Sequence, residues 1–100
     1  MPGYQIEVTE GAVADLAAFR AFERKEIVQA IRAQLLYEPL TETANRKTLR
    51  TNSLKAAWEL RIGQFRVFYV VIEDTQVVRI IAIGRKTHNR LFIRGKEVDL

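Results

Sequence analysis

The stretch that most constrains the fold is residues 58–72, with the sequence WELRIGQFRVFYVVI. It predicts two antiparallel strands joined at Gly63-Gln64, because a glycine at the first position of a two-residue connection suits a tight hairpin turn. Side chains alternate between the faces of a strand. One face of this hairpin is therefore entirely apolar or aromatic and is expected in the core, with Trp58, Leu60, Ile62, Phe65, Val67, Tyr69 and Val71.

The other face of the hairpin, here called the charged face, carries Glu59, Arg61 and Arg66. The expected register places Arg61 directly across from Arg66. Like charges in opposed positions destabilise a sheet, so we expect compensation by Glu59 or by an anionic ligand. A surface pair partly neutralised by Glu59 and an anion-binding site are both consistent with the sequence.

The segments around the hairpin predict an α+β fold. Residues 4–8 alternate between apolar and polar as in a strand, and Thr9 can cap a helix that follows. The apolar spacing then predicts two helices with a bend, an αα-hairpin that Pro39 ends near Leu36 or Tyr37. We therefore expect one domain over residues 1–100, with an N-terminal strand and an αα-hairpin packed on one face of an antiparallel sheet of three to four strands.

The third strand of this sheet is expected at residues 77–85, where VVRIIAIGR is almost continuously apolar and so predicts a central position. The turn before it leaves its register open by one residue. One register places Arg79 and Arg85 on the charged face, and the other places Lys86 there. The tail, with a turn at Gly95, predicts a last short strand or hairpin.

Composition excludes several classes of site. The chain has no Cys and one His, which excludes a disulfide framework and a structural zinc site, and we expect no metal and no cofactor. There is no Gly-rich phosphate loop. The N-terminus lacks the pattern of a signal peptide, and no apolar run approaches the roughly 20 residues of a membrane span. We expect a cytoplasmic protein that does not bind membranes.

Charge is divided unevenly along the chain. Residues 1–42 carry four basic and seven acidic side chains, and the remainder carries twelve basic and five acidic ones. This division predicts a polyanion or an acidic protein as partner, with solvation alone as the alternative. The polar connection at residues 38–57 is long for a compact domain, which favours a functional loop. It contains Arg46, Lys47, Arg50 and Lys55.

The order strand–helix–helix–three antiparallel strands, with an arginine just after the tight turn in GQFRVFY, resembles the RelE/ParE toxin superfamily of bacterial toxin–antitoxin systems. The resemblance spans most of the chain. Its most specific parts are NRKTLR, WELRIGQFRVFYVV and IAIGRKTHNRLF. It implies a toxin with a cognate antitoxin protein as partner, in a hetero-oligomer with it.

The resemblance leaves three functions open. The RelE branch contains ribosome-dependent endoribonucleases that cut mRNA, which would make the ribosome and mRNA the partners. The ParE branch inhibits DNA gyrase without nuclease residues. A third interpretation is a catalytically inactive relative that binds nucleic acid or protein. The RelE-like interpretation, a metal-independent mRNA interferase, is the one we expect.

By position, Arg66 matches the arginine that the nucleases use on the scissile phosphate, and Lys86 or the adjacent Arg85 matches a later basic residue. Phe92 stands where RelE-like nucleases often have a catalytic Tyr. Ala57 and Glu59 stand where the best-known branch has a lysine pair. Related nucleases use a Glu or a His, and Glu59 and His88 would supply these.

The chemistry sets matching requirements. Attack by the 2′-OH on phosphorus needs a base, cations on the phosphoryl oxygens and an acid for the leaving 5′-oxygen. We expect Arg61 and Arg66 on the phosphate, Glu59 as base, and His88 or Lys86 as acid. Glu59 as a mere ion-pair partner and His88 as a solvated loop residue are the alternatives. The expected RNA-binding residues are Arg46, Lys47, Arg50, Arg85, Arg90 and Phe92.

Overall fold

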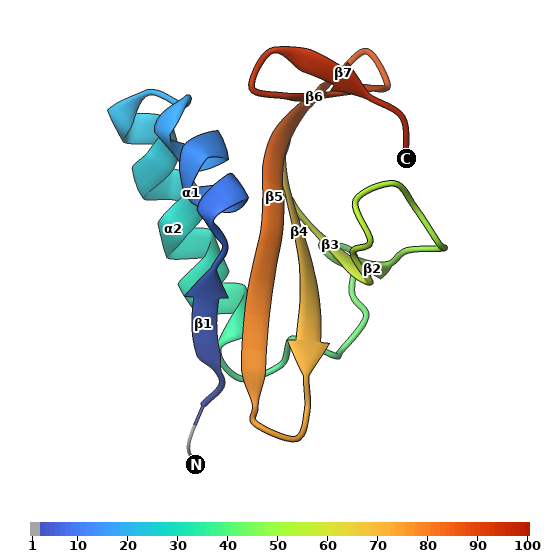
Figure 1. Cartoon of the computed structure of the whole chain (residues 1–100). Coiled ribbons are helices and arrows are strands. Elements are labelled where there is room, and N and C mark those ends of the chain that lie inside the picture. Colours follow the sequence, from blue (N-terminus) through green and yellow to red (C-terminus); the bar gives the residue numbers. More distant parts are fainter. Residues whose placement is uncertain (1–2) are drawn as a thin grey trace.

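The computed structural model describes residues 3–100, in which two helices cover one face of a seven-stranded sheet (Figure 1). The elements in chain order are β1 (Gln5–Val8), α1 (Glu10–Ala17), α2 (Ala21–Leu35), β2 (Arg46–Thr48), β3 (Trp58–Ile62), β4 (Phe65–Ile72), β5 (Val77–Thr87), β6 (Arg90–Ile93) and β7 (Lys96–Val98). The sheet order is β2-β3-β4-β5-β6-β7, with antiparallel neighbours, and β1 pairs with β5 in parallel.

The predicted α+β class, the N-terminal strand and the αα-hairpin are confirmed, but the sheet has seven strands where three to four were expected. Strands β2 and β7 have three residues each and β6 has four. Strands β6 and β7 form the hairpin at Gly95 that the tail left open as a strand or a hairpin, and the three residues of β2 are too few to show a two-residue period in the sequence. In the part of the chain that is described, no helix has the length and apolar character to cross a membrane.

The hairpin of β3 and β4 has the predicted register, with Arg61 across from Arg66 and Trp58 across from Tyr69. Gly63 has a φ of 56° in its turn, a conformation that glycine adopts without strain. The apolar face packs against α2 in one core cluster with Ile27, Ile31 and Leu35. This packing fixes which way the charged face points, which is away from the helices.

A bulge in β5 decides which cations share the charged face. Phe68 pairs with Ala82 but Tyr69 pairs with Ile80, so Ile81 is an extra residue in β5. Before the bulge, Arg79 aligns with Val70 on the charged face. After the bulge, Gly84 aligns with Arg66, which places Lys86 on the charged face and Arg85 on the helix-side face. The two registers left open by the sequence therefore occur in different halves of one strand.

The outer edge of β5 between β1 and β6 is covered by side chains. The amide and hydroxyl of Thr9 donate to the carbonyl of Ile80 at 3.2 and 2.9 Å. The buried carboxylate of Asp15 accepts from the amide of Ile83 at 3.0 Å. Buried backbone groups require such partners, so α1 and its N-cap complete the sheet at this point and hold the bulge.

The charged face has a small core of its own around Phe68, which is fully buried. The 49–57 connection and the β6–β7 hairpin lie on the side of the sheet away from the helices (Figure 1). They contribute Ala56, Leu91 and the partly buried Leu49, Leu54, Ile93 and Val98 to the cluster around Phe68. Strand β6 crosses directly over Gly84, where an added Cβ would lie 2.7 Å from the carbonyl oxygen of Phe92. Glycine at this position lets β6 form a wall beside Arg66.

Gly84→Ala is expected to lower the free energy of unfolding by roughly 1–3 kcal/mol, because the methyl group would meet backbone that cannot move aside cheaply. Gly11→Ala is the matched control. It lies in α1 with nothing within 4 Å of the added Cβ, so it should raise the same free energy by roughly 0.4–1 kcal/mol. Urea unfolding of both variants checks this, and equal effects of the two substitutions would contradict the close approach of β6.

Candidate functional site

The centre of the charged face is the carboxylate of Glu59, whose side chain is 5% exposed. Its Oε1 accepts a hydrogen bond from Arg61 Nε at 2.9 Å, and its Oε2 lies 3.9 Å from Arg66 Nε. A buried carboxylate is costly unless it is paired. The arginines therefore offset the cost of burying the Glu59 carboxylate. Glu59 in turn offsets the repulsion between the two arginines, which lie opposite each other across the hairpin.

The two arginines differ in accessibility. The Arg66 side chain is 15% exposed, and its Nη1 donates to the carbonyls of Gly63 and Phe65 at 2.7 and 3.0 Å. Burial lowers the pKa of the Arg66 guanidinium, Glu59 opposes this, and Arg61 adds to it, although an arginine stays protonated in proteins. The Arg61 side chain is 44% exposed. Arg61 thus presents its charge outward, while Arg66 is anchored beneath.

Two lysines complete this face. Lys47 pairs with Glu59 across β2 and β3, which places both side chains on the same side of the sheet. The amide of Lys86 donates to the carbonyl of Gln64 at 2.8 Å and ties the end of β5 to the hairpin turn. Lys47, Arg61, Arg66 and Lys86, from four strands, thus share this face with Glu59, while Arg79 lies further along β5 and is paired with Glu7. Guanidinium and ammonium groups in this arrangement bind phosphate or carboxylate anions.

Arg46 was expected among the RNA-binding residues, but its guanidinium is buried, with 7% of the side chain exposed. It donates to the carbonyl of Thr41, to the carbonyl of Gln34 and to Gln34 Oε1, each at 2.8 Å, and lies 3.6 Å from Glu38. These contacts attach the 38–57 connection to α2. The role of Arg46 is structural, and it is not available to a phosphate.

Arg85 and Phe92 pair across β5 and β6 on the helix-side face, away from Glu59. Arg85 donates to Glu23 at 2.7 Å, and its guanidinium carbon lies 5.5 and 5.3 Å from the ring centres of Phe19 and Phe65. Hydrogen bonds from the amide of Arg20 and from Arg85 hold the pKa of Glu23 below its usual value.

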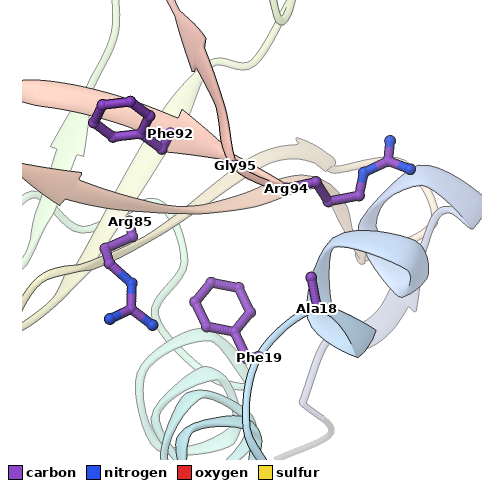
Figure 2. A pocket seen from close by; sticks show the side chains of 6 residues that line it. All are labelled: Ala18, Phe19, Arg85, Phe92, Arg94 and Gly95. Atoms are coloured by element: carbon purple, nitrogen blue, oxygen red, sulfur yellow. The ribbon is translucent and has the colours of Figure 1, made fainter.

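A pocket of about 210 Å³ lies beside these residues, with Arg85 on one side and Arg94 on the other (Figure 2). Arg94 Nε lies 2.7 Å from Asp15 Oδ1, an ion pair without the alignment of a hydrogen bond. Both arginines are thus paired with helix carboxylates. They fasten the helix layer to the C-terminal strands, and this pocket is separate from the Glu59 cluster.

His88 and Arg90 lie at the tip of the β5–β6 hairpin. His88 and Asn89 form its turn with φ values of 52° and 65°, and both are exposed. Arg90 lies 3.8 Å from Glu97. Within residues 3–100, neither His88 nor Arg90 has a hydrogen bond or ion pair with Glu59, Arg61 or Arg66.

Two residues that shape the site were not singled out from the sequence. Gly84 lets β6 approach Arg66, and its signal was a glycine inside an apolar strand, which often marks close backbone approach. Asp15 accepts a hydrogen bond from the backbone at the edge of β5. Its indication in the sequence was the position of a carboxylate directly before Leu16, on the apolar side of α1. Charged residues are almost never fully buried unless they are paired.

Comparison with known proteins gives a family match over most of the chain. Residues 6–90 match the family model described as the ParE toxin of the type II toxin–antitoxin system parDE. Among curated protein sequences no match is found.

Solved structures give the fold. A chain of the RelBE2 toxin–antitoxin complex from Mycobacterium tuberculosis is 24% identical, with a TM-score of 0.73 over 86% of this chain and 94% of that one. A chain of the RelE–RelB complex from the archaeon Pyrococcus horikoshii is 21% identical, with a TM-score of 0.65 over 82% of this chain and 93% of that one. A mutant of the Escherichia coli toxin RelE in the free state is 20% identical, with a TM-score of 0.63 over 83% of this chain and 83% of that one.

At these identities the structural likeness establishes the fold, and the family model covers most of the chain. The resemblance to the RelE/ParE superfamily is thereby confirmed. The chain belongs to the ParE toxin family of type II toxin–antitoxin systems, within the RelE/ParE superfamily.

Proposed function

We propose that this toxin is an endoribonuclease that cuts mRNA on the ribosome, in the cytoplasm, and that the charged face is its active site. The observation that supports this most is that Lys47, Arg61, Arg66 and Lys86, from four different strands, lie on the same face of the sheet as the carboxylate of Glu59, which is paired with both arginines. Such an arrangement matches the charge that develops on a phosphate as its ester bond is exchanged.

In the proposed reaction the RNA supplies its own nucleophile, the 2′-OH. Glu59 accepts the proton of this hydroxyl, the 2′-oxygen bonds to the adjacent phosphorus, and the bond from phosphorus to the 5′-oxygen breaks. Arg61 and Arg66 hold the non-bridging oxygens. Lys86, which is on the same face, is the better-placed proton donor for the leaving 5′-oxygen, because His88 lies in the exposed turn. The products are a 2′,3′-cyclic phosphate and a free 5′-hydroxyl.

Glu59 is buried and paired with both arginines, so the proposal requires the arginines to exchange partners. An incoming phosphate competes with the carboxylate for Arg61, whose side chain is the more exposed of the two. When Arg61 turns to the phosphate, one oxygen of Glu59 is released beside the bound nucleotide. Charge-assisted pairs of arginine with carboxylate and with phosphate are of similar strength, so this exchange has a small net cost in free energy.

We also propose a cognate antitoxin as partner. Two of the similar structures are toxin–antitoxin complexes, and the C-terminal part of this chain carries twelve basic side chains against five acidic ones. An acidic segment of the antitoxin that covers the charged face would neutralise these cations and exclude RNA.

A second candidate is inhibition of a protein such as DNA gyrase without catalysis. Three observations favour it: the family model is that of ParE toxins, Phe92 has no hydroxyl and lies on the helix-side face, and Glu59 is covered in the free protein. In this case the charged face would bind an acidic protein surface, and no RNA would be cut.

Arg66→Ala is expected to slow RNA cleavage on translating ribosomes by on the order of 10²–10³, the scale of losing one donor to a developing oxyanion. Glu59→Gln keeps the shape but removes the proton acceptor, and is expected to slow cleavage by roughly 10²–10⁴. Primer extension on ribosome-bound mRNA gives the rates, and circular dichroism checks the fold. Lys25→Ala on α2 is the control, with unchanged cleavage. Unchanged cleavage in Arg66→Ala would refute the proposed site.

Induced expression of the protein is expected to slow growth, and a co-expressed cognate antitoxin to restore it. The two functions are then separated with purified protein in two assays, mRNA cleavage on ribosomes and supercoiling by gyrase. The proposal predicts cleavage and normal supercoiling. Growth arrest with intact mRNA and inhibited supercoiling would favour the second candidate, and normal growth with abundant soluble protein would argue against a toxin.

A further inference from the structure

A groove of about 330 Å³ lies where the 49–57 connection leaves β2 and enters β3, and is here called the β2–β3 groove. Leu49 and Ala57, directly beyond the ends of β2 and β3, line it together with Arg50 and Lys55 of the loop, which are both exposed. No acidic residue is among the side chains that line it. Figure 1 shows this segment, in yellow-green, on the side of the sheet away from the helices.

The side chain of Asn52 holds the loop that forms the groove. Its Nδ2 donates to the carbonyls of Arg50 and Ala56 at 2.7 and 2.8 Å, and its Oδ1 accepts from the amides of Leu54 and Ala56 at 3.1 and 3.3 Å. These four bonds use the full hydrogen-bonding capacity of an amide side chain. The cations of the loop are therefore presented by a conformation that exists before any ligand binds.

Two further contacts fix the loop. Ser53 Oγ donates to the carbonyl of Asp99 at 2.7 Å, which joins the loop to the C-terminal segment. Leu54 and Ala56 pack in the core cluster around Phe68. Lys55 has a φ of 57°, a conformation that costs a non-glycine residue free energy and persists only where the surroundings impose it. Preorganisation of this kind lowers the entropy cost of binding.

The groove continues the charged face. The amide of Leu49 donates to the carbonyl of Ala57 at 2.9 Å, which extends the β2–β3 ladder by one step. Ala57, Glu59 and Arg61 alternate with Trp58 and Leu60, so they lie on the same side of β3. At about 3.3 Å per residue, the groove begins roughly 7 Å from Glu59 and roughly 13 Å from Arg61. Lys47, the cross-strand partner of Glu59, lies between the groove and Arg61.

We propose that the β2–β3 groove is a second phosphate-binding subsite, which holds the backbone of the RNA strand whose scissile phosphate lies on Arg61 and Arg66. This inference rests on the proposed nuclease function and adds to it where the substrate runs. Arg50 and Lys55 bind a phosphate at a distance from the cleaved bond, and Lys47 bridges the two subsites. The small side chain of Ala57 leaves room for the sugar–phosphate chain.

An acidic peptide is the other ligand that such cations could bind. The observations favour RNA, because peptide recognition commonly anchors apolar side chains in pockets, and the apolar groups near this groove are already used. Leu49 and Leu54 pack against the Phe68 cluster. A row of cations along one strand edge, with no free apolar anchor, is instead the pattern of a polyanion track.

The test uses single-stranded 2′-O-methyl RNA, which binds but cannot be cleaved because its 2′-oxygen is blocked. Fluorescence anisotropy gives the affinity for a trinucleotide and for a 12-mer at several salt concentrations. Arg50→Ala/Lys55→Ala is expected to weaken 12-mer binding roughly tenfold or more and to reduce the slope of log K against log salt by about 1.4, or about 0.7 for each lost contact. Its affinity for the trinucleotide should not change.

Two further variants sharpen the result. Lys25→Ala/Arg32→Ala removes the same charge from exposed positions on α2 and should leave both affinities near those of the wild type. Asn52→Ala keeps both cations but releases the loop, so it should weaken 12-mer binding severalfold with the salt slope unchanged. A loss in the α2 control equal to that in the groove variant would show a general charge effect and overturn the proposal.

The two proposals fail separately. If Arg50→Ala/Lys55→Ala binds the 12-mer as the wild type does, while Arg66→Ala loses the trinucleotide, the groove is not an RNA subsite but the proposed active site stands. If the groove variant loses the 12-mer but Arg66→Ala retains the trinucleotide, the active site is wrong and the groove stands. A groove variant that binds RNA normally but loses a 12-residue poly-glutamate peptide would assign the groove to an acidic protein.

Discussion

A buried carboxylate beneath two opposed arginines is the interaction on which the charged face depends. The tight turn at Gly63 places Arg61 directly across from Arg66, an arrangement that repels unless a negative charge lies between them. Glu59 supplies that charge and is in turn stabilised by both cations. Because the opposite face of the same hairpin is the centre of the core, the cluster cannot rotate away from this position. The core thus fixes a set of charges that would not assemble by attraction alone.

Much of this arrangement was predictable, because it follows from local rules. The hairpin register follows from a glycine turn and from alternation, both of which are visible in residues 58–72. What could not be predicted depends on contacts between distant segments. The bulge at Ile81 is held by Thr9 and Asp15, more than sixty residues away in sequence. It reverses the face of every side chain after it, so Lys86 and not Arg85 joins Glu59.

Cations that look alike in the sequence have three different roles in the structure. Arg46 is buried and attaches the long connection to α2. Arg85 and Arg94 pair with carboxylates of the helix layer and fasten it to the C-terminal strands. The cations of the charged face and of the β2–β3 groove keep at least part of their charge for a ligand. The excess of basic residues in the sequence predicts a negatively charged partner. Burial and ion pairing determine which of these cations remain accessible to it.

A double-mutant cycle measures whether Glu59 holds Arg61 and Arg66 together. The free energy of unfolding is measured in urea for the wild type, Glu59→Gln, Arg66→Ala and the double variant. Arg66→Ala is expected to destabilise the wild type but to be neutral or stabilising in the Glu59→Gln background, because it then relieves repulsion from Arg61. The coupling should be about 1 kcal/mol or more. Additivity of the two substitutions within about 0.3–0.5 kcal/mol would contradict it.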